Sequence, residues 1–142
     1  MKALTVWQPW AQLLAMGTKS IETRSWGTRY RGRILIHAAK ADHQYIILRY
    51  PHELFQHFEA AGAIYKDFSL GAIIGQANLV ECIQMDQEYC DRMKKQNPAE
   101  YAFGNYEPGR YAWVMKDAVL FDKPIPAKGK QGLWNWEDDA NE

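Results

Sequence analysis

The chain has 142 residues, with 17 basic and 17 acidic side chains and 47% hydrophobic residues. This length and balance predict one globular domain over residues 1–142 and exclude a fibrous or disordered chain. No apolar run approaches the roughly 18–20 residues of a membrane span, and no leader is evident after Met1, so a cytoplasmic setting without membrane partners is expected. In that reducing setting Cys82 and Cys90 are expected to be free thiols.

The charges are distributed unevenly along the chain. Residues 1–40 carry seven lysines and arginines against Glu22 alone, whereas residues 41–142 carry ten basic and sixteen acidic side chains. In a neutral protein such asymmetry indicates a basic face that can meet phosphates. Three tryptophans lie among the cations of residues 7–33, and this mixture of cations and flat rings suits a nucleotide or a nucleic acid.

The first predicted elements are short. A strand over residues 3–7 is followed by a helix, because Pro9 suits a first helical turn and Gly17 suits a helix end. An extended segment over 20–25 comes next. After a basic loop, alternating apolar residues predict a strand over 33–38.

The middle of the chain combines helices with one long strand. Asp42 is expected to cap a helix that ends before Pro51, and a second helix is expected over 53–61. Residues 72–83 give the clearest strand pattern. Within it, Gly75 indicates a bulge or a close approach of two backbones.

The last third of the chain returns to strands. Asp86 is expected to cap a helix that runs to Gln96, and residues 97–108 are expected to form a loop. Two strands are predicted within residues 111–121, and residues 133–136 close the fold. Together the elements predict an α+β fold in which about five to six strands form a small, closed or nearly closed β-barrel with flanking helices.

A sequence signature lies near the start of the chain. The pattern G-x-K-x-x-E-x-R occupies residues 17–24, between Gln8-Pro9-Trp10-Ala11 and Tyr30-Arg31-Gly32-Arg33. With these flanks it resembles the signature of the ASCH family (activating signal cointegrator homology), in particular the C-terminal domain of the eukaryotic coactivator and stand-alone bacterial members. Residues 75–82 and 128–134 resemble the family's central strand and closing segment. The resemblance implies a PUA-like β-barrel with a positively charged cleft, and an association with RNA or DNA.

The signature segment itself offers charged groups. In an extended segment Glu22 and Arg24 point to one side while Ile21 points to the other, into the core. Lys19 follows the helix-ending Gly17 and is expected to project from the rim of the cleft. The structural alternative is a Glu22–Arg24 pair that holds the barrel closed, and such a pair can also fix the guanidinium to grip phosphate.

The other candidate contacts are cations and aromatic rings around the signature. Trp7 and Trp26 are the stacking candidates, whereas Trp10 lies on the apolar face of the first helix and is expected in the core. For the basic residues the alternative is a solvated loop or turn. The predicted contacts to nucleic acid or ligand are Trp7, Gln8, Lys19, Glu22, Arg24, Trp26, Arg29, Arg31, Arg33, Lys128 and Lys130.

Three functions fit these residues. The first is a module that binds nucleic acid or a modified nucleotide in a basic, aromatic-lined cleft. The second is a small hydrolase, a ribonuclease or an amidohydrolase of a modified nucleoside, in which Lys19 and Glu22 act as catalytic residues. In the acetylcytidine amidohydrolases of the family a threonine stands at the place of Glu22, which weakens that reading. The third is a protein-interaction adaptor in transcription regulation that uses residues 39–69.

No cofactor and no metal site is predicted. The run from His52 to His57 is one residue too long for H-E-x-x-H, and Cys82 and Cys90 do not form a C-x-x-C pair. The expected partner is therefore a nucleic acid or a nucleotide.

Overall fold

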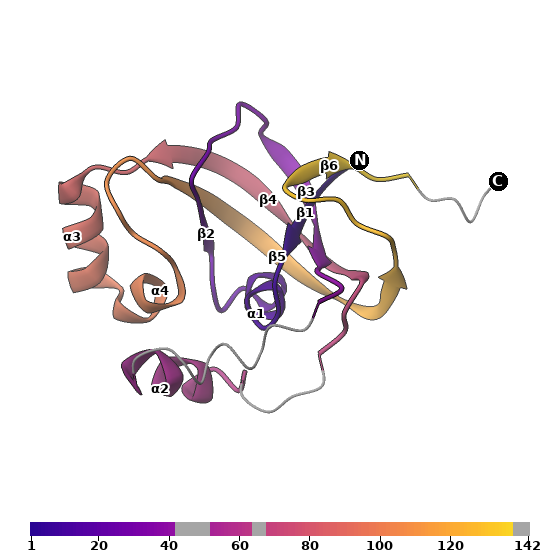
Figure 1. The fold of residues 1–142 in the computed structure, drawn as a ribbon, viewed down its shortest axis with the longest axis horizontal. Helices are drawn as coiled ribbons and strands as arrows, with labels where there is room; N and C mark the ends of the chain where they lie inside the picture. The colour runs from indigo at the N-terminus through magenta and orange to yellow at the C-terminus, as the bar shows by residue number, and fades with distance from the viewer. Residues whose placement is uncertain (42–51, 64–67, 138–142) are drawn as a thin grey trace.

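The computed structural model describes residues 1–41, 52–63 and 68–137, so the helix predicted from Asp42 lies outside the described residues. Figure 1 shows the arrangement of the elements. In chain order they are β1 (Lys2–Val6), α1 (Trp10–Met16), β2 (Ile21–Arg24), β3 (Gly32–Ala38), α2 (His52–Ala60), β4 (Ala72–Gln84), α3 (Gln87–Gln96), α4 (Pro98–Phe103), β5 (Tyr111–Pro126) and β6 (Leu133–Asn135).

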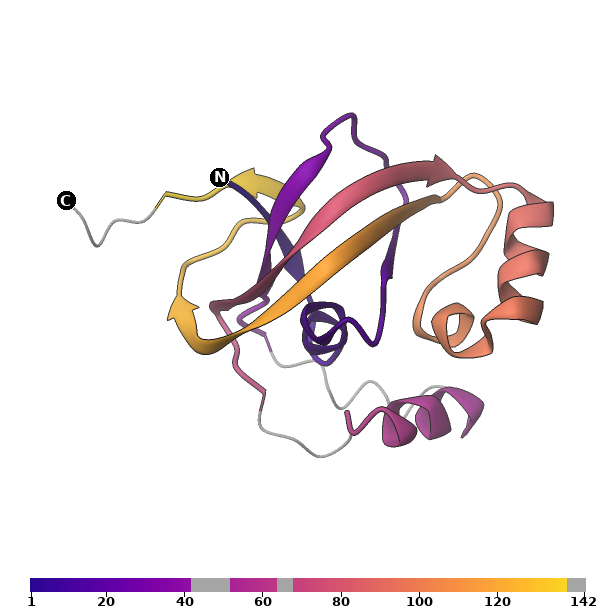
Figure 2. The same cartoon turned by 180° about the vertical axis from the view of Figure 1, so that it is seen from behind.

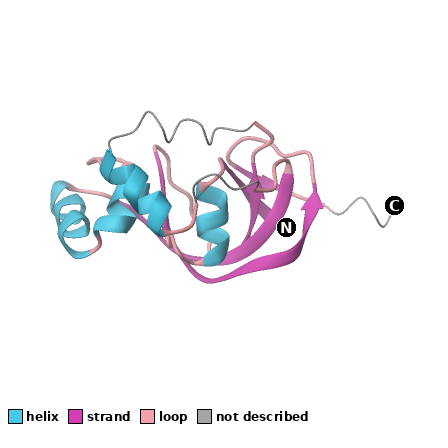
Figure 3. Cartoon of the chain, turned by 90° about the horizontal axis from the view of Figure 1, so that it is seen from below, coloured by secondary structure: helices cyan, strands magenta, loops and turns pink. Residues whose placement is uncertain are grey.

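The six strands form one sheet in the order β2-β5-β4-β3-β1-β6. The pair β1–β3 is parallel, and the other neighbouring strands are antiparallel. The sheet curls so that α1 packs within its concave side, against β3, β4 and β5 (Figure 3). The α+β prediction is therefore confirmed, with the barrel realised as a curled half-barrel whose edge strands are β2 and β6.

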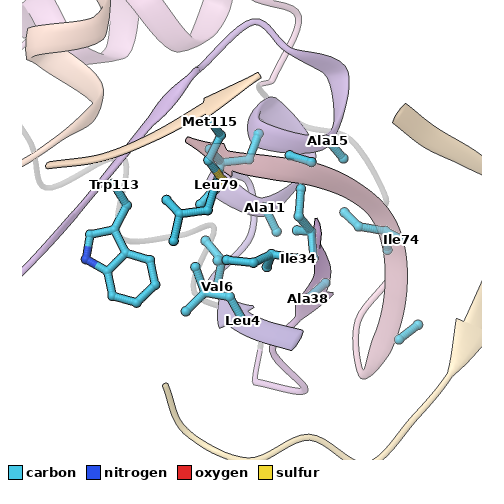
Figure 4. Packing of buried hydrophobic residues seen from close by; sticks show 14 residues of the cluster. Leu4, Val6, Ala11, Ala15, Ile34, Ala38, Ile74, Leu79, Trp113 and Met115 are labelled. Carbon is cyan, nitrogen blue, oxygen red and sulfur yellow. The ribbon is translucent and has the colours of Figure 1, made fainter. Parts of the chain in front are cut away.

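The main hydrophobic core lies between this concave face and α1 (Figure 4). Leu4, Ile34 and Leu79 come from three neighbouring strands and are fully or almost fully buried. Trp113 of β5 is also completely buried, and its indole Nε1 donates a hydrogen bond to the carbonyl oxygen of Trp26 at 3.2 Å. Burying a large apolar side chain contributes about 1.5–3 kcal/mol, so this cluster supplies much of the stability that holds the curl.

Helix α1 begins at Trp10, directly after Pro9, and ends at Met16. The side-chain oxygen of Gln8 accepts a hydrogen bond from the backbone N–H of Gln12 at 2.9 Å, which satisfies a donor of the first turn. Gly17 ends the helix in the left-handed conformation, with φ 80°, as predicted.

Gly75 lies at a register shift between β4 and β5, where the pairing jumps from Ile73–Ile125 to Gly75–Leu120. A Cβ atom placed on this glycine would lie 2.4 Å from the carbonyl oxygen of Val119 on β5. The prediction of a bulge or a close backbone approach is therefore confirmed.

Two predictions for the last third of the chain are wrong. Residues 97–108 are not all loop, because they contain α4: Asn97 Oδ1 accepts the N–H of Glu100 at 3.3 Å, and Pro98 occupies the first turn. The two strands expected within 111–121 are one continuous strand, β5. Its backbone turns at Asp117, with φ 56°, near the expected break.

Helices α2, α3 and α4 gather beyond one end of the sheet, and α4 packs against both of the others. Figure 2 shows this group from behind, opposite the end at which the N-terminus lies beside β6. There the backbone N–H of Trp136 donates to the carbonyl of Met1 at 2.8 Å. Among the described residues, no helix combines the length and the apolar character that crossing a membrane requires.

Candidate functional site

A cavity of about 670 Å³, called the cleft below, opens between the ends of β1 and β2 and the helices α2 and α4. Its size lies within the range of about 300–1,000 Å³ that is usual for small-molecule sites. The residues that line it are Thr5, Val6, Trp7, Trp10, Glu22, Thr23, Arg24, Glu53, Leu54, Tyr101, Ala102, Phe103, Gly104, Asn105 and Arg110.

The cleft is aromatic but not basic. Trp7, Trp10, Tyr101 and Phe103 contribute its rings, as expected for an aromatic-lined site. Its charged residues are two arginines and two glutamates: Glu22, Arg24, Glu53 and Arg110. The lining is thus electrically balanced, and the positive charge expected of the cleft is not found there.

Glu22 and Arg24 form an ion pair at the wall of the cleft. Arg24 Nε and Nη2 both donate to Glu22 Oε2, at 3.1 and 2.8 Å, and Nη2 also donates to the carbonyl oxygen of Thr5 at 2.8 Å. Ile21 is buried on the opposite side, so the prediction from strand alternation is confirmed. Because Thr5 belongs to β1, the pair connects β2 to β1 across the open side of the half-barrel.

Lys19 is placed differently from the prediction. Its side chain is fully buried, and the expectation that it projects from the cleft rim is wrong. Nζ donates to the carbonyl oxygen of Ile21 and lies 3.8 Å from Glu22 Oε1 and 3.7 Å from Glu100 Oε1. The physical reason is charge compensation: two enclosed carboxylates are costly unless a cation lies between them.

Glu100 is a site residue that the sequence analysis missed. Its two carboxylate oxygens accept the backbone N–H groups of Ser20 and Ile21, each at 3.0 Å, so α4 holds the start of β2. Together Glu100, Lys19, Glu22 and Arg24 form a charge network of alternating sign that is buried except at Arg24, whose side chain is 20% exposed. The start signal of α4 is readable in the sequence, but a contact with residues some 80 positions away leaves no local pattern.

Gln8 has a structural role in this fold. It is 0% exposed, and its amide nitrogen donates to the carbonyl of Ser69 at 3.0 Å while its oxygen caps α1. Trp7 lines the cleft and is 49% exposed. Trp10 is only partly in the core: it packs against Phe58, yet it also lines the cleft.

The remaining predicted contacts lie outside the cleft lining. They are the exposed residues Trp26, Arg29, Arg31, Arg33, Lys128 and Lys130. Arg31 Nη1 donates to the carbonyls of Thr28 and Tyr30 at 2.9 and 2.8 Å, so it stabilises its own loop. The structure thus separates a charge-balanced cleft from cations that are exposed outside its lining.

The loop that joins β5 to β6, called the closing loop (residues 127–132), is fastened to β1 and β3. Thr5 Oγ1 donates to the carbonyl of Lys130 at 2.6 Å. His37 Nε2 lies 2.8 Å from the carbonyl of Ala127 and therefore donates to it, and Nδ1 lies 3.2 Å from Thr5 Oγ1. The backbone of this loop is thereby held in a defined place beside the cleft residue Thr5.

The buried His37 makes stability depend on pH. Burial lowers the pKa of its imidazole below the ordinary 6.5, although the hydrogen bond to the Ala127 carbonyl opposes this shift. The unfolded chain therefore takes up a proton at higher pH than the folded one. We expect the free energy of unfolding to fall as pH drops through 6.5 toward the folded-state pKa, by at most about 1.4 kcal/mol per pH unit.

Urea unfolding between pH 5 and 8 measures this dependence, with His37→Gln as the matched variant. The variant should lose the part of the slope that lies below pH 6.5. An unchanged slope in His37→Gln would assign the effect to other groups.

Comparison with known proteins gives a consistent result. The model of the ASCH domain matches residues 4–125. Activating signal cointegrator 1 of Homo sapiens is 28% identical over 134 residues, and that of Mus musculus is 25% identical over 136 residues. Each alignment covers 92% of this chain and 21% of the relative, so the chain spans about a fifth of the length of these proteins.

Solved structures show the same fold. The crystal structure of ASCH from Zymomonas mobilis superposes with a TM-score of 0.57 at 16% identity, covering 98% of this chain and 88% of that one. A mutant form of the same protein gives a TM-score of 0.56 at 17% identity, covering 97% of this chain and 90% of that one. The half-barrel is thus a PUA-like fold with flanking helices, and the chain belongs to the ASCH domain family.

Proposed function

We propose that this domain is a nucleic-acid or modified-nucleotide binding module whose cleft takes a single unstacked nucleobase. The observation that carries the proposal is the combination of aromatic walls and a charge-balanced, hydrogen-bonding wall in one cavity of about 670 Å³. An unpaired base has the matching form, because it has two flat faces and a polar edge.

The aromatic walls supply the stacking energy. Trp7 and Tyr101 reach the cleft from different elements, one after β1 and the other in α4. Stacking of a base on an aromatic side chain contributes about 1–3 kcal/mol and works for every base. The cleft is therefore suited to the base itself, because every base has a flat aromatic face.

The Glu22–Arg24 pair supplies polar groups for the edge of the base. Both of its hydrogen bonds use Glu22 Oε2, and Arg24 contributes Nε and Nη2. Glu22 Oε1 faces the buried Lys19 Nζ at 3.8 Å, so the polar group that the pair can offer to a base is the Arg24 guanidinium. A guanidinium fixed in this way can donate to a ring nitrogen or a carbonyl at the edge of a base.

Charge balance argues against a phosphate inside the cleft. A phosphate there would meet Glu22 and Glu53 as well as the two arginines, so its attraction would be largely cancelled. The exposed cations outside the cleft lining are better suited to the sugar–phosphate chain. The family is associated with nucleic acids, which agrees with this division between base and backbone.

The hydrolase and adaptor alternatives receive less support. The buried Lys19 is enclosed by Ile21, Glu22 and Glu100, which leaves it no path to an oxyanion in the cleft. The adaptor function is supported by the names of the relatives, activating signal cointegrator 1, and not by a feature of the described residues. The aromatic residue Phe58 of the expected adaptor segment is fully buried against other residues of the domain rather than presented to a partner.

Calorimetric titration with nucleosides and mononucleotides, acetylcytidine included, tests the proposal. Trp7→Ala should lower the affinity for the nucleoside about 5- to 150-fold, which corresponds to the loss of one stacking contact. Met16→Ala is the matched control, because Met16 has the same 49% exposure and lies outside the cleft lining. No binding of any nucleoside, or equal affinity in Trp7→Ala, would contradict the proposal. Turnover of acetylcytidine or short RNA that Glu22→Gln abolishes would instead establish the hydrolase.

A further inference from the structure

We infer that Trp26 is a second base-stacking site beside the cleft, so that the preferred ligand is a single strand of at least two nucleotides rather than a lone nucleotide. The inference rests on the proposed function of the cleft. It adds a second site, a path between the two sites, and the groups that meet the intervening phosphates.

Trp26 is an exposed ring held in a fixed position. Its indole packs edge-to-face against the buried Trp113, with centroids 4.9 Å apart and planes at 87°. Its carbonyl oxygen accepts the indole N–H of Trp113 at 3.2 Å. Despite these contacts Trp26 remains 38% exposed. A rigid, open aromatic surface loses little conformational entropy when a base stacks on it, which favours such a role.

The ring of Trp26 lies next to the closing loop. A Cβ atom placed on Gly132 would lie only 3.2 Å from Cζ2 of the indole, so the loop backbone abuts the ring directly. Gly132 has φ 72°, a conformation that suits glycine, and no side chain intervenes between loop and ring.

Thr5 joins this surface to the cleft. Its backbone N–H donates to the carbonyl of Gly132 at 3.1 Å, and its own carbonyl accepts Arg24 Nη2 at 2.8 Å. Thr5 also lines the cleft. A single residue of β1 therefore separates the Trp26 surface from the cleft, and a strand with one base in the cleft can continue over Thr5 to Trp26.

The closing loop carries the cations for the phosphates of that strand. Lys128 and Lys130 are exposed, and neither has an ion-pair partner within the described part of the chain. The carbonyl of Lys130 is fixed to Thr5 Oγ1 at 2.6 Å, which places the loop beside the path. Lysines that are not paired with carboxylates suit phosphate, because they can neutralise it and displace its counterions without first breaking an ion pair of their own.

A duplex is not expected to be the preferred ligand. In a double helix the faces of neighbouring bases are stacked on each other, so neither the cleft nor the Trp26 surface can reach them without opening the pairs. Sequence preference should be modest on the Trp26 surface, because stacking accepts every base.

The test compares a mononucleotide with a trinucleotide of the same base, DNA and RNA in parallel, by calorimetric or fluorescence titration. The wild-type chain should bind the trinucleotide more tightly, and Trp26→Leu should reduce that affinity about 5- to 150-fold while the mononucleotide affinity stays unchanged. Leucine keeps an apolar contact with Gly132 and Trp113, and Trp26→Tyr should retain most of the gain. Trp136→Ala, which changes a tryptophan outside the cleft lining, is the control and should change neither affinity.

Salt supplies an independent readout. Mononucleotide affinity should vary little with salt, whereas the logarithm of trinucleotide affinity should fall with the logarithm of salt concentration by about 0.7 for each phosphate contacted. Lys128→Ala and Lys130→Ala should each reduce this slope, and Lys116→Ala on β5 should not.

Equal trinucleotide affinity of wild type and Trp26→Leu would overturn the inference, as would equal weakening of both ligands or tighter binding of a duplex of the same length. These outcomes differ from failure of the proposed function. In that case the mononucleotide would not bind, or Trp7→Ala would bind it normally.

Discussion

Replacing Lys19 by methionine is expected to lower the free energy of unfolding by about 3–5 kcal/mol, the usual cost of removing one partner from a buried ion pair. Methionine fills similar space but leaves Glu22 and Glu100 facing each other without the intervening ammonium. The carbonyl of Ile21 also loses its donor. Urea unfolding followed by circular dichroism measures the loss.

Two variants decide whether charge is the cause. Lys116→Met removes an exposed lysine of β5 and should change stability by less than about 0.5 kcal/mol, as most surface substitutions do. Adding Glu100→Gln to Lys19→Met removes one of the uncompensated carboxylates and should recover part of the loss. If Lys19 were a ligand contact, Lys19→Met would weaken nucleotide binding and leave unfolding unchanged, which is the opposite pattern.

The burial of Lys19 could not be predicted from the signature. Strand alternation correctly placed Ile21 in the core and Glu22 with Arg24, because that rule depends only on backbone geometry. Lys19 lies just before the strand, where the rule no longer applies. Its direction is decided by Glu100, a residue from α4 whose approach depends on the complete fold.

A similar limit applies to the cleft. The excess of cations in residues 1–40 is real, but the charge of a cavity depends on which side chains meet in space. Glu53 and Arg110 reach the lining from α2 and from the segment before β5, and neither belongs to the basic segment. The predicted cations lie on the surface instead. Because they are separate from the cleft, they can meet the phosphates while the cleft takes the base.

Strand order and curvature could be predicted only in part. The strands follow from local patterns of apolar residues. The end of α1 at Gly17 and the bulge at Gly75 follow from the positions of the two glycines. The open half-barrel does not follow from such patterns, because the segments on its two sides meet through side chains. Arg24 on Thr5 and Trp26 on Gly132 bridge that opening, and long-range contacts of single side chains leave no periodic signal.

Gly75→Ala is expected to destabilise the fold by about 3 kcal/mol, the upper end of the cost of overpacking a core. The new methyl group would lie 2.4 Å from the carbonyl oxygen of Val119 and 2.9 Å from Cβ of Ala15. The first neighbour is backbone of the paired strand, so it can move only if β4 and β5 separate. The second belongs to α1, so the clash also presses on the helix that fills the concave side.

Thermal and urea unfolding of Gly75→Ala measure this cost, with Gln76→Ala at the next, half-buried position of β4 as the control. The control adds no atoms between the strands and should cost less than about 1 kcal/mol. If Gly75→Ala lowers the free energy of unfolding by less than about 0.5 kcal/mol, β5 can shift at this bulge. The close approach of β4 and β5 would then not determine the curvature of the sheet. A large loss would identify the contact between β4 and β5 at Gly75 as the point that fixes the curvature. That curvature brings the ends of β1 and β2 close enough for Arg24 to bond Thr5, which is the contact on which both proposed binding surfaces depend.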